Sequence, residues 1–316
     1  MKARKIPLNK VVYHKEIYLF VLPTVLLVGL FAYYPASSGL VHSFYRWNGA
    51  EISEYRGLAN YRELLTDIRF WTSFKVALLL GLVNVLKMIP ALAVAVLIHR
   101  VRSPRMQYAY RVLFVTPMVI PMVVMILMWK FFFEPTSGVL NQALRSSGLL
   151  DLLARADAWF GWGVFSHFAN PAWLGEPALA FSALIIWGFP WVGTFAVLTY
   201  LARLQGIGEE IYESADIDGA SAWTKFLYVE LPLILSMVRV NLVFVIIATL
   251  QDAVLVLLLF GPTGGPGGVV QVPALFMFQE AFLMLHFGKA CAIGVVLTAI
   301  MFVLSKLNER FVRIEH

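Results

Sequence analysis

The sequence is short of charge and almost without cysteine. Only 14% of its 316 residues are Asp, Glu, Lys or Arg, whereas an average soluble domain has about 25%, and its mean hydropathy is +0.76. So few charged side chains leave too little polar surface for a soluble domain of this length. The single cysteine, Cys291, excludes an internal disulfide and a metal site made of cysteines, and its apolar neighbours predict a packing role. These deficits predict an integral membrane protein.

Sequence patterns for catalysis and nucleotide binding are also missing. The chain has no G-x-x-x-x-G-K-[ST] phosphate loop, no H-E-x-x-H metal motif and no G-x-S-x-G nucleophile turn. The Gly-rich segment 264–268 has no lysine and is predicted to be a turn. The net charge of +6 does not indicate nucleic acid, because the basic residues flank apolar runs instead of forming one patch. We therefore expect no enzyme activity, no cofactor bound by this chain and no nucleic-acid partner.

Six apolar runs are long enough, or nearly so, to cross a bilayer, which takes about 20 residues per helix. They are 17–37, 74–99, 111–132, 179–201, 238–260 and 290–306, and the last can extend backward through 282–287. Because lipid cannot satisfy the open edge of a sheet, these runs predict an all-α fold of six transmembrane helices. The first run follows basic residues as a signal peptide does, but it exceeds the usual length of about 7–15 apolar residues, so we predict a retained helix.

The basic residues are divided unequally between the two sides of these helices. The loops on one side hold 15 Lys and Arg residues, and those on the other side hold 9. The positive-inside rule then places both termini and the loop 208–232 in the cytoplasm, with segments 57–74 and 135–177 outside. Aromatic residues crowd the second outer segment, which suits either the membrane interface or a cap packed on the helices. They are Trp159, Phe160, Trp162, Phe165, Phe168 and Trp173.

The loop 208–232 is a polar stretch between two apolar runs, and residues 212–233 read YESADIDGASAWTKFLYVELPL. Carboxylates at its start favour the positive end of a helix dipole. Gly219 can end that helix in a left-handed conformation, and Asp218 or Ser221 can cap a second helix. Pro232 marks the next boundary. The pattern predicts two short helices joined by a tight turn, which is either a docking element or an ordinary connection.

Several stretches, in order along nearly the whole chain, resemble one family of transport proteins. The run Glu213-Ser-Ala215-Asp-Ile217-Asp218-Gly219-Ala220, with Leu231-Pro232 after it, is similar to the E-A-A, D-G-A, L-P pattern of permease subunits in binding-protein-dependent ABC importers. Ser214 stands where that family usually has Ala. Four further stretches resemble the carbohydrate-type branch: Arg56-Gly57-Leu58-Ala59-Asn60-Tyr61, Trp129 to Asn141, Trp173 to Pro177, and Gly264-Gly265-Pro266-Gly267.

The resemblance implies a type I ABC importer transmembrane domain over 17–312, between a cytoplasmic segment 1–16 and a tail 313–316. It implies import of a sugar, oligosaccharide or polyol across a bacterial or archaeal cytoplasmic membrane. The loop 208–232 would hold the coupling helix, which seats on a separate ATPase subunit that binds ATP and Mg²⁺. The implied contact residues are Glu213, Ala215, Asp218, Gly219 and Ala220. The other implied partners are a second homologous permease, an extracytoplasmic solute-binding protein and membrane lipid.

Four polar residues inside the apolar runs are candidates for the translocation path, because a polar side chain at mid-bilayer is costly. Asn84 and Lys87 share one face of the second run, and Gln251 and Asp252 lie in the outer part of the fifth. Such groups can hydrogen-bond a sugar. The alternative is structural, with a buried Lys87–Asp252 ion pair or polar contacts between helices.

Other classes of membrane protein remain as alternatives. An ion-coupled secondary transporter would work without an ATPase and would have inverted repeats with broken helices, of which the sequence has no clear pair. A membrane enzyme would need a catalytic cluster at the end of a helix. Within the ABC importers, an amino-acid or peptide permease is the nearest rival, but the G-L-x-N-Y stretch and the G-G-P turn disfavour it.

Overall fold

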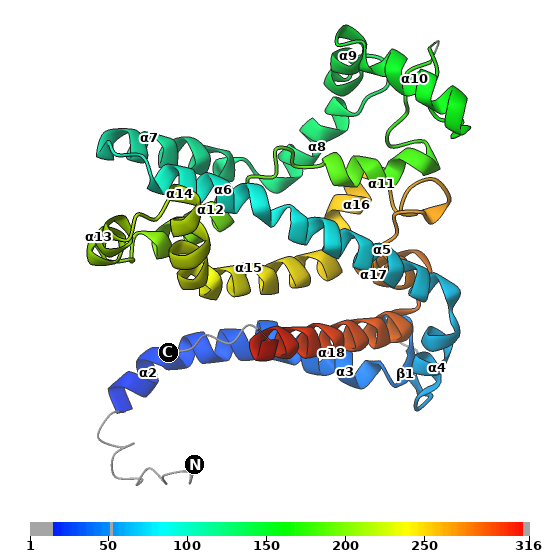
Figure 1. The fold of residues 1–316 in the computed structure, drawn as a ribbon. Helices are drawn as coiled ribbons and strands as arrows, with labels where there is room; N and C mark the ends of the chain where they lie inside the picture. The colour runs from blue at the N-terminus through cyan, green and yellow to red at the C-terminus, as the bar shows by residue number, and fades with distance from the viewer. Residues whose placement is uncertain (1–14, 51–52, 168, 312–316) are drawn as a thin grey trace. The chain divides into compact units, whose positions relative to one another are not determined.

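The computed structural model describes residues 15–50, 53–167 and 169–311, which are mostly helical (Figure 1). The chain divides into two compact units. The N-terminal unit consists of Met1–Thr66 with Glu280–Val295, and the core unit consists of Asp67–Gln279 with Val296–His316. The tail 313–316 and most of the segment 1–16 lie outside the described residues, and the domain bounds given above stay a prediction.

An apolar helical run begins the N-terminal unit. It comprises α2 (Lys15–Val28), the π-helical turn η1 (Gly29–Tyr33) and α3 (Tyr34–His42). Its residues Tyr18–His42 are long and apolar enough to cross a membrane. An antiparallel hairpin of β1 (Tyr45–Trp47) and β2 (Ser53–Tyr55) follows, with Tyr45 opposite Tyr55, and then α4 (Ala59–Thr66). The chain returns to this unit in η5 (Gln279–Leu283) and the first turns of α18 (Phe287–Phe311).

Asn60, from the G-L-x-N-Y stretch, fastens the hairpin to α4. Its side-chain amide donates to the carbonyls of Ser43 at 2.8 Å and Tyr45 at 2.9 Å, and the residue is 3% exposed. Gly288 packs so closely here that a Cβ on it would lie 2.0 Å from the Tyr45 carbonyl oxygen. The G-L-x-N-Y stretch, which contributes to the resemblance to importer permeases, therefore has a packing role in this unit.

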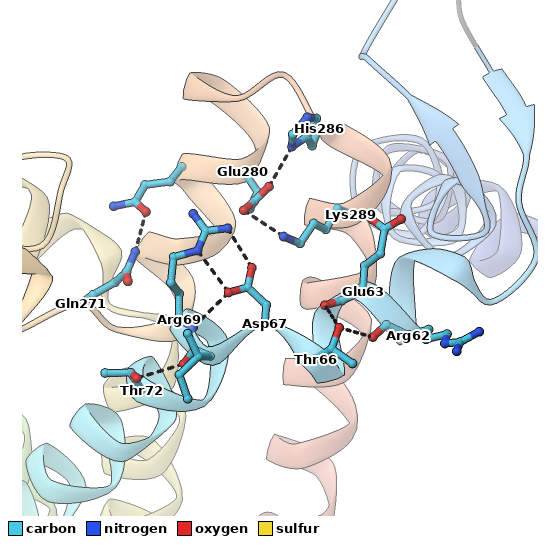
Figure 2. A network of polar contacts seen from close by, with 12 residues as sticks. Arg62, Glu63, Thr66, Asp67, Arg69, Thr72, Gln271, Glu280, His286 and Lys289 are labelled. Carbon is cyan, nitrogen blue, oxygen red and sulfur yellow. Dashed lines mark hydrogen bonds and ion pairs between the residues drawn. The ribbon is translucent and has the colours of Figure 1, made fainter.

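A buried carboxylate links η5 to α18 within the same unit. Glu280 is 2% exposed, and its two oxygens lie 3.0 Å from Lys289 Nζ and 3.0 Å from His286 Nδ1 (Figure 2). Leu285, between Glu280 and His286 in the sequence, has φ +56°, a left-handed backbone conformation that residues other than glycine rarely adopt. The predicted backward extension of the last helix through 282–287 is therefore wrong, since the helix begins only at Phe287.

The core unit is a sequence of helices and short helical turns (Figure 1). In chain order these are α5 (Ile68–Leu86), α6 (Met88–His99), α7 (Pro104–Val115), η2 (Thr116–Val119), α8 (Met122–Phe132), α9 (Val139–Ser146), α10 (Leu149–Phe160), α11 (Pro177–Ile186), α12 (Thr194–Leu204), α13 (Glu209–Ile217), α14 (Ala222–Lys225), η3 (Phe226–Glu230), α15 (Leu231–Gln251), α16 (Ala253–Phe260), η4 (Pro266–Gly268), α17 (Pro273–Phe278) and the rest of α18. Helix α12 packs on both α6 and α15, and α15 packs on α5.

Two apolar clusters hold this unit together. In one, Ala95 of α6 and Leu204 of α12, both fully buried, pack with Ile234 of α15. In the other, Leu80 of α5 packs with Val256 of α16 and with buried residues of α8, α11 and α17. Small and branched side chains bring these helices close together, as is usual for helix packing in membranes.

Three of the six apolar runs are broken rather than continuous, and a fourth, 74–99, is interrupted only at Lys87 within the long helix Ile68–His99. Within the described residues four helices are long and apolar enough to span a membrane, or five if the pair Pro104–Val119 and Met122–Phe132, bent by 89°, counts as one. Run 179–201 forms two shorter helices, α11 and α12, and run 238–260 is interrupted at Asp252. Pro117 and Pro121 explain the bend after α7, because proline lacks the N–H that a continuing helix requires.

Pro232 does not end a helix, contrary to the prediction. Residues Ala222–Gln251 form one helical run of 30 residues, with the π-helical turn η3 directly before Pro232. Pro232 is the second residue of α15 and lies inside this run, directly after η3, where the Leu231 N–H donates to the Phe226 carbonyl. The second of the two predicted short helices is thus the beginning of a long one.

Part of the aromatic segment 135–177 packs on the helices, as the expectation of a cap requires. Trp173 is 5% exposed and packs on Phe133, while its indole N–H donates to Asn141 at 2.8 Å. These residues form a packed cap. By contrast, Trp159, at the end of α10, is 88% exposed. Phe168 lies outside the described residues.

Candidate functional site

Local sequence rules build the helix α13. Its first turn carries Glu209 and Glu210 at the positive end of the dipole. It ends in a Schellman turn, in which Gly219 N–H donates to Asp216 O at 3.0 Å and Ala220 N–H donates to Ala215 O at 2.9 Å. Gly219 has φ +72°, which confirms the predicted left-handed position.

Ser221 caps the helix that follows. Its Oγ accepts from the Thr224 N–H at 3.2 Å, so Ser221 rather than Asp218 is the N-cap. Asp218 is instead the last residue before the glycine turn. An ion pair between Asp216 and Lys225 joins α13 to α14. The two helices are therefore fixed to each other by a turn, a cap and a surface charge pair.

One side of α13 is open to solvent. Among the predicted contact residues, Glu213, Asp218 and Gly219 are exposed, and Ala215 and Ala220 are half-buried. Ile217 is 87% exposed, which is unusual for an isoleucine outside an apolar run. The structure thus places Ala215, Asp218, Gly219 and Ala220 at the turn that ends α13, and Glu213 in the middle of the same helix.

The opposite side of α13 contacts a buried charge network that the sequence analysis missed. Glu230 is 1% exposed, and Arg100 Nη2 donates to its Oε2 at 2.9 Å and Arg100 Nε to its Oε1 at 3.4 Å. Arg100 Nη2 also donates to the carbonyl of Ala222 at 2.8 Å. The only sequence signal was a lone glutamate directly before the Leu-Pro pair.

Tyr212 of α13 joins the same network. Its hydroxyl hydrogen-bonds His99 Nε2, at the end of α6, at 3.0 Å. Burial, and to a lesser degree the nearby charge of Glu230, raise the pKa of Tyr212 to about 12. The phenol therefore stays protonated at physiological pH beside the carboxylate.

Lys87 lies at a helix break rather than beside Asp252. The residue separates α5 from α6, and its Nζ donates to the carbonyl of Leu184 at 2.9 Å and to that of Trp187 at 3.2 Å. These two carbonyls lie at the C-terminal end of α11, where carbonyl groups lack a donor within the helix. The Lys87–Asp252 ion pair considered above is not formed in the described structure, because the ammonium is used to cap α11.

Asp252 and its neighbours are also engaged within the protein. Asp252 caps α16, with its Oδ1 accepting from the Leu255 N–H at 3.0 Å. Asn84 Nδ2 donates to Thr249 Oγ1 at 3.0 Å, which joins α5 to α15. Gln251 is exposed and donates to the Met301 sulfur, a weak acceptor, at 3.4 Å.

An apolar groove of about 450 Å³ lies between α5, α15 and α18 in the core unit. Its walls include Gly81, Leu242 and Ile300, with Thr249 as a polar member. The four predicted path residues lie outside its lining. Of the four, Lys87 and Asp252 thus bind backbone groups at helix breaks, whereas Asn84 bonds Thr249 at the groove wall.

Comparison with known proteins extends this description. Residues 91–314 match the family described as binding-protein-dependent transport system inner membrane component. The chain is 30% identical, over 89% of its length and 90% of the relative's, to a probable ABC transporter permease protein of Pyrococcus horikoshii. It is 31% identical, over 88% of its length and 76% of the relative's, to the diacetylchitobiose uptake system permease protein NgcF of Streptomyces coelicolor.

A solved structure has a similar fold. It is the crystal structure of a bacterial alginate ABC transporter in complex with an alginate pentasaccharide-bound periplasmic protein, with a TM-score of 0.77, 21% identity and coverage of 96% of both chains. This chain belongs to the family of binding-protein-dependent transport system inner membrane components. The predicted identity as an ABC importer permease of the sugar-importer type is confirmed, and the ion-coupled transporter is not favoured.

Proposed function

We propose that α13 is the coupling helix of this permease and seats on a separate ATPase subunit. The observation that carries this proposal is the exposed turn after α13, where Gly219 and half-buried Ala220 end a rigidly capped helix that carries exposed Glu213 in its middle. A glycine and an alanine there let another surface approach the backbone closely. ATP and Mg²⁺ bind to that ATPase, and its closure displaces α13.

The transported solute is a sugar, an oligosaccharide or a polyol. This part of the proposal is supported by the relatives, since NgcF is named for diacetylchitobiose uptake and the solved transporter imports alginate. Among the four candidate path residues, Asn84 and Gln251 contact the solute, because amides can exchange their weak internal contacts for sugar hydroxyls. Lys87 and Asp252 instead hold the helix breaks.

The chain lies in the cytoplasmic membrane of a bacterium or archaeon with both termini inside. Six spans result when α11 and α12 count as one broken span and the bent pair α7–α8 as another. The charge asymmetry of the loops supports this orientation. The partners are two ATPase subunits, a second homologous permease and a solute-binding protein, of the kind named as the periplasmic protein in the alginate complex.

The test replaces Gly219 by arginine in cells that also make the ATPase and the second permease. Gly148, between α9 and α10, is a matched control because it has the same φ of +72° and equally open surroundings. Both variants introduce the same backbone strain, about 1–2 kcal/mol for a left-handed residue. We expect Gly219→Arg, but not Gly148→Arg, to abolish co-purification of the ATPase and solute-stimulated ATP hydrolysis. Glu213→Ala, on the exposed face of α13, should reduce both the co-purification of the ATPase and the solute-stimulated ATP hydrolysis.

Two results would contradict the proposal. One is normal transport by Gly219→Arg, which would make the loop a simple connection. The other is failure of the wild-type chain to co-purify any ATPase when all subunits are present. Equal loss in both glycine variants would attribute the effect to strain and would also count against docking at α13.

A further inference from the structure

We propose that the network of Arg100, Glu230 and Tyr212 makes the coupling helix α13 and the helix α6 move as one body. This inference rests on the proposed function, because it requires α13 to be the element that the ATPase displaces. The three residues do not contact solute or nucleotide. They are positioning residues, and they determine how far a displacement of α13 is transmitted into the helices.

The burial of Glu230 is the first reason. A carboxylate that is 1% exposed is costly unless donors surround it. Here Arg100, at the end of α6, donates to it. Tyr212 of α13 lies near the carboxylate and hydrogen-bonds His99, the last residue of α6, at 3.0 Å. Removing Arg100 leaves a buried charge unpaired, and removing the Tyr212 hydroxyl breaks the polar contact between α13 and α6, so the free energy favours keeping all three elements together.

The geometry is the second reason. Arg100 presents two nitrogens to the two oxygens of Glu230, an arrangement that fixes orientation as well as distance. The same guanidinium donates to the carbonyl of Ala222, the first residue of α14. One side chain thus fixes the end of α6 to both the beginning and the end of the segment 222–230.

The position of α6 is the third reason. This helix has 12 residues and is therefore about 18 Å long. One end carries Arg100, and the other begins at Lys87, which caps α11. Between its ends, α6 packs on α12 through a fully buried cluster. A displacement of α13 therefore reaches the break at Lys87 through a helix and a charge network, without passing through a flexible loop.

A purely structural role predicts something different. If the network only stabilised the fold, its loss would reduce assembly and transport together. If it transmits displacement, the assembled complex would still hydrolyse ATP, but fewer solute molecules would cross per ATP. The ratio of solute transported to ATP hydrolysed separates these cases, because it does not depend on how much complex is assembled.

The experiment uses the complete complex, with both permeases, the ATPases and the binding protein, in lipid vesicles loaded with ATP. The variants are Glu230→Gln, which removes the charge, and Tyr212→Phe, which removes only one hydroxyl and leaves the ion pair. Arg203→Gln is the control, because Arg203 of α12 also joins two helices, donating to the backbone carbonyl of Leu233 in α15 at 3.0 Å, but does not take part in the network.

We expect Glu230→Gln to lower the transport ratio about tenfold while the ATPase still co-purifies, Tyr212→Phe to lower it less, and Arg203→Gln to leave it unchanged. The inference is overturned if Tyr212→Phe and Glu230→Gln keep the wild-type ratio, or if the ratio falls equally in the control. Should Glu230→Gln fail to assemble, Tyr212→Phe alone decides. A wild-type chain that binds no ATPase would instead refute the proposed function.

Discussion

The loop 208–232 and the helix breaks inside the apolar runs are stabilised by different kinds of contact. In the loop, the glycine turn and the Ser221 cap join residues that are three to five positions apart. At the breaks, Lys87 reaches carbonyls 97 and 100 positions away, and inside two continuous helices Asn84 of α5 reaches Thr249 of α15 at a separation of 165. Exposed backbone groups can be satisfied by water, whereas those inside an apolar run require a protein partner. Local chemistry is therefore enough in the loop but not at the breaks.

Replacing Lys87 by methionine gives the largest expected loss of stability. The variant keeps the length of the side chain but leaves the carbonyls of Leu184 and Trp187 without their donor. We expect the free energy of unfolding to fall by about 2 kcal/mol, as for a charge-assisted hydrogen bond at a partly buried site. Denaturant titration in mixed micelles measures this change.

Lys130 provides the control for Lys87. It also donates to a backbone carbonyl, that of Leu258 at 3.3 Å, but from an exposed position. Lys130→Met should lower the free energy of unfolding by well under half as much as Lys87→Met does. An equal loss of stability in the two variants would mean that Lys87 does not stabilise the helix break more than an exposed lysine stabilises its site.

Asp252→Ala should have the second-largest effect. We expect the free energy of unfolding to fall by about 1 kcal/mol, because α16 loses its N-cap. Asn caps helices as well as Asp does, so Asp252→Asn should keep both the stability and the beginning of α16 at Ala253. The same titration tests stability, and a solute uptake assay tests function. A loss of uptake in Asp252→Asn without a loss of stability would assign Asp252 to the solute path instead.

Ser221→Ala removes the N-cap of α14. It should lower the free energy of unfolding by only about 0.5–1 kcal/mol, because the cap is exposed and water can replace its hydrogen bond. The effect should stay local, with faster hydrogen exchange at the Thr224 amide and none at the helix breaks. Faster exchange near Leu184 as well would show that the two regions are less separate than their contacts indicate.

The Asn84–Thr249 contact should be the weakest of the four. A double-mutant cycle with Asn84→Ala and Thr249→Val is expected to give a coupling of about 0.6 kcal/mol, the average for hydrogen bonds between membrane helices. A coupling above about 2 kcal/mol would contradict this estimate and would indicate that the pair holds α5 and α15 in register.

Much of the loop could be predicted from the sequence. Gly219 as the left-handed turn and a helix beginning at Glu209 follow from rules that act over a few residues. Where two local options existed, as for Asp218 and Ser221, the sequence did not decide between them. Pro232 was misread because its place inside a helical run depends on the π-helical turn before it.

The apolar runs determined by themselves that this is a helical membrane protein, because only helices satisfy their own backbone in lipid. Only the tertiary structure decided where those helices break, because a break is tolerated where a distant side chain such as Lys87 supplies the missing donor. It also decided that Arg100, Glu230 and Tyr212 meet. These residues are far apart in the sequence, and hydropathy carries no information about which buried charges will pair.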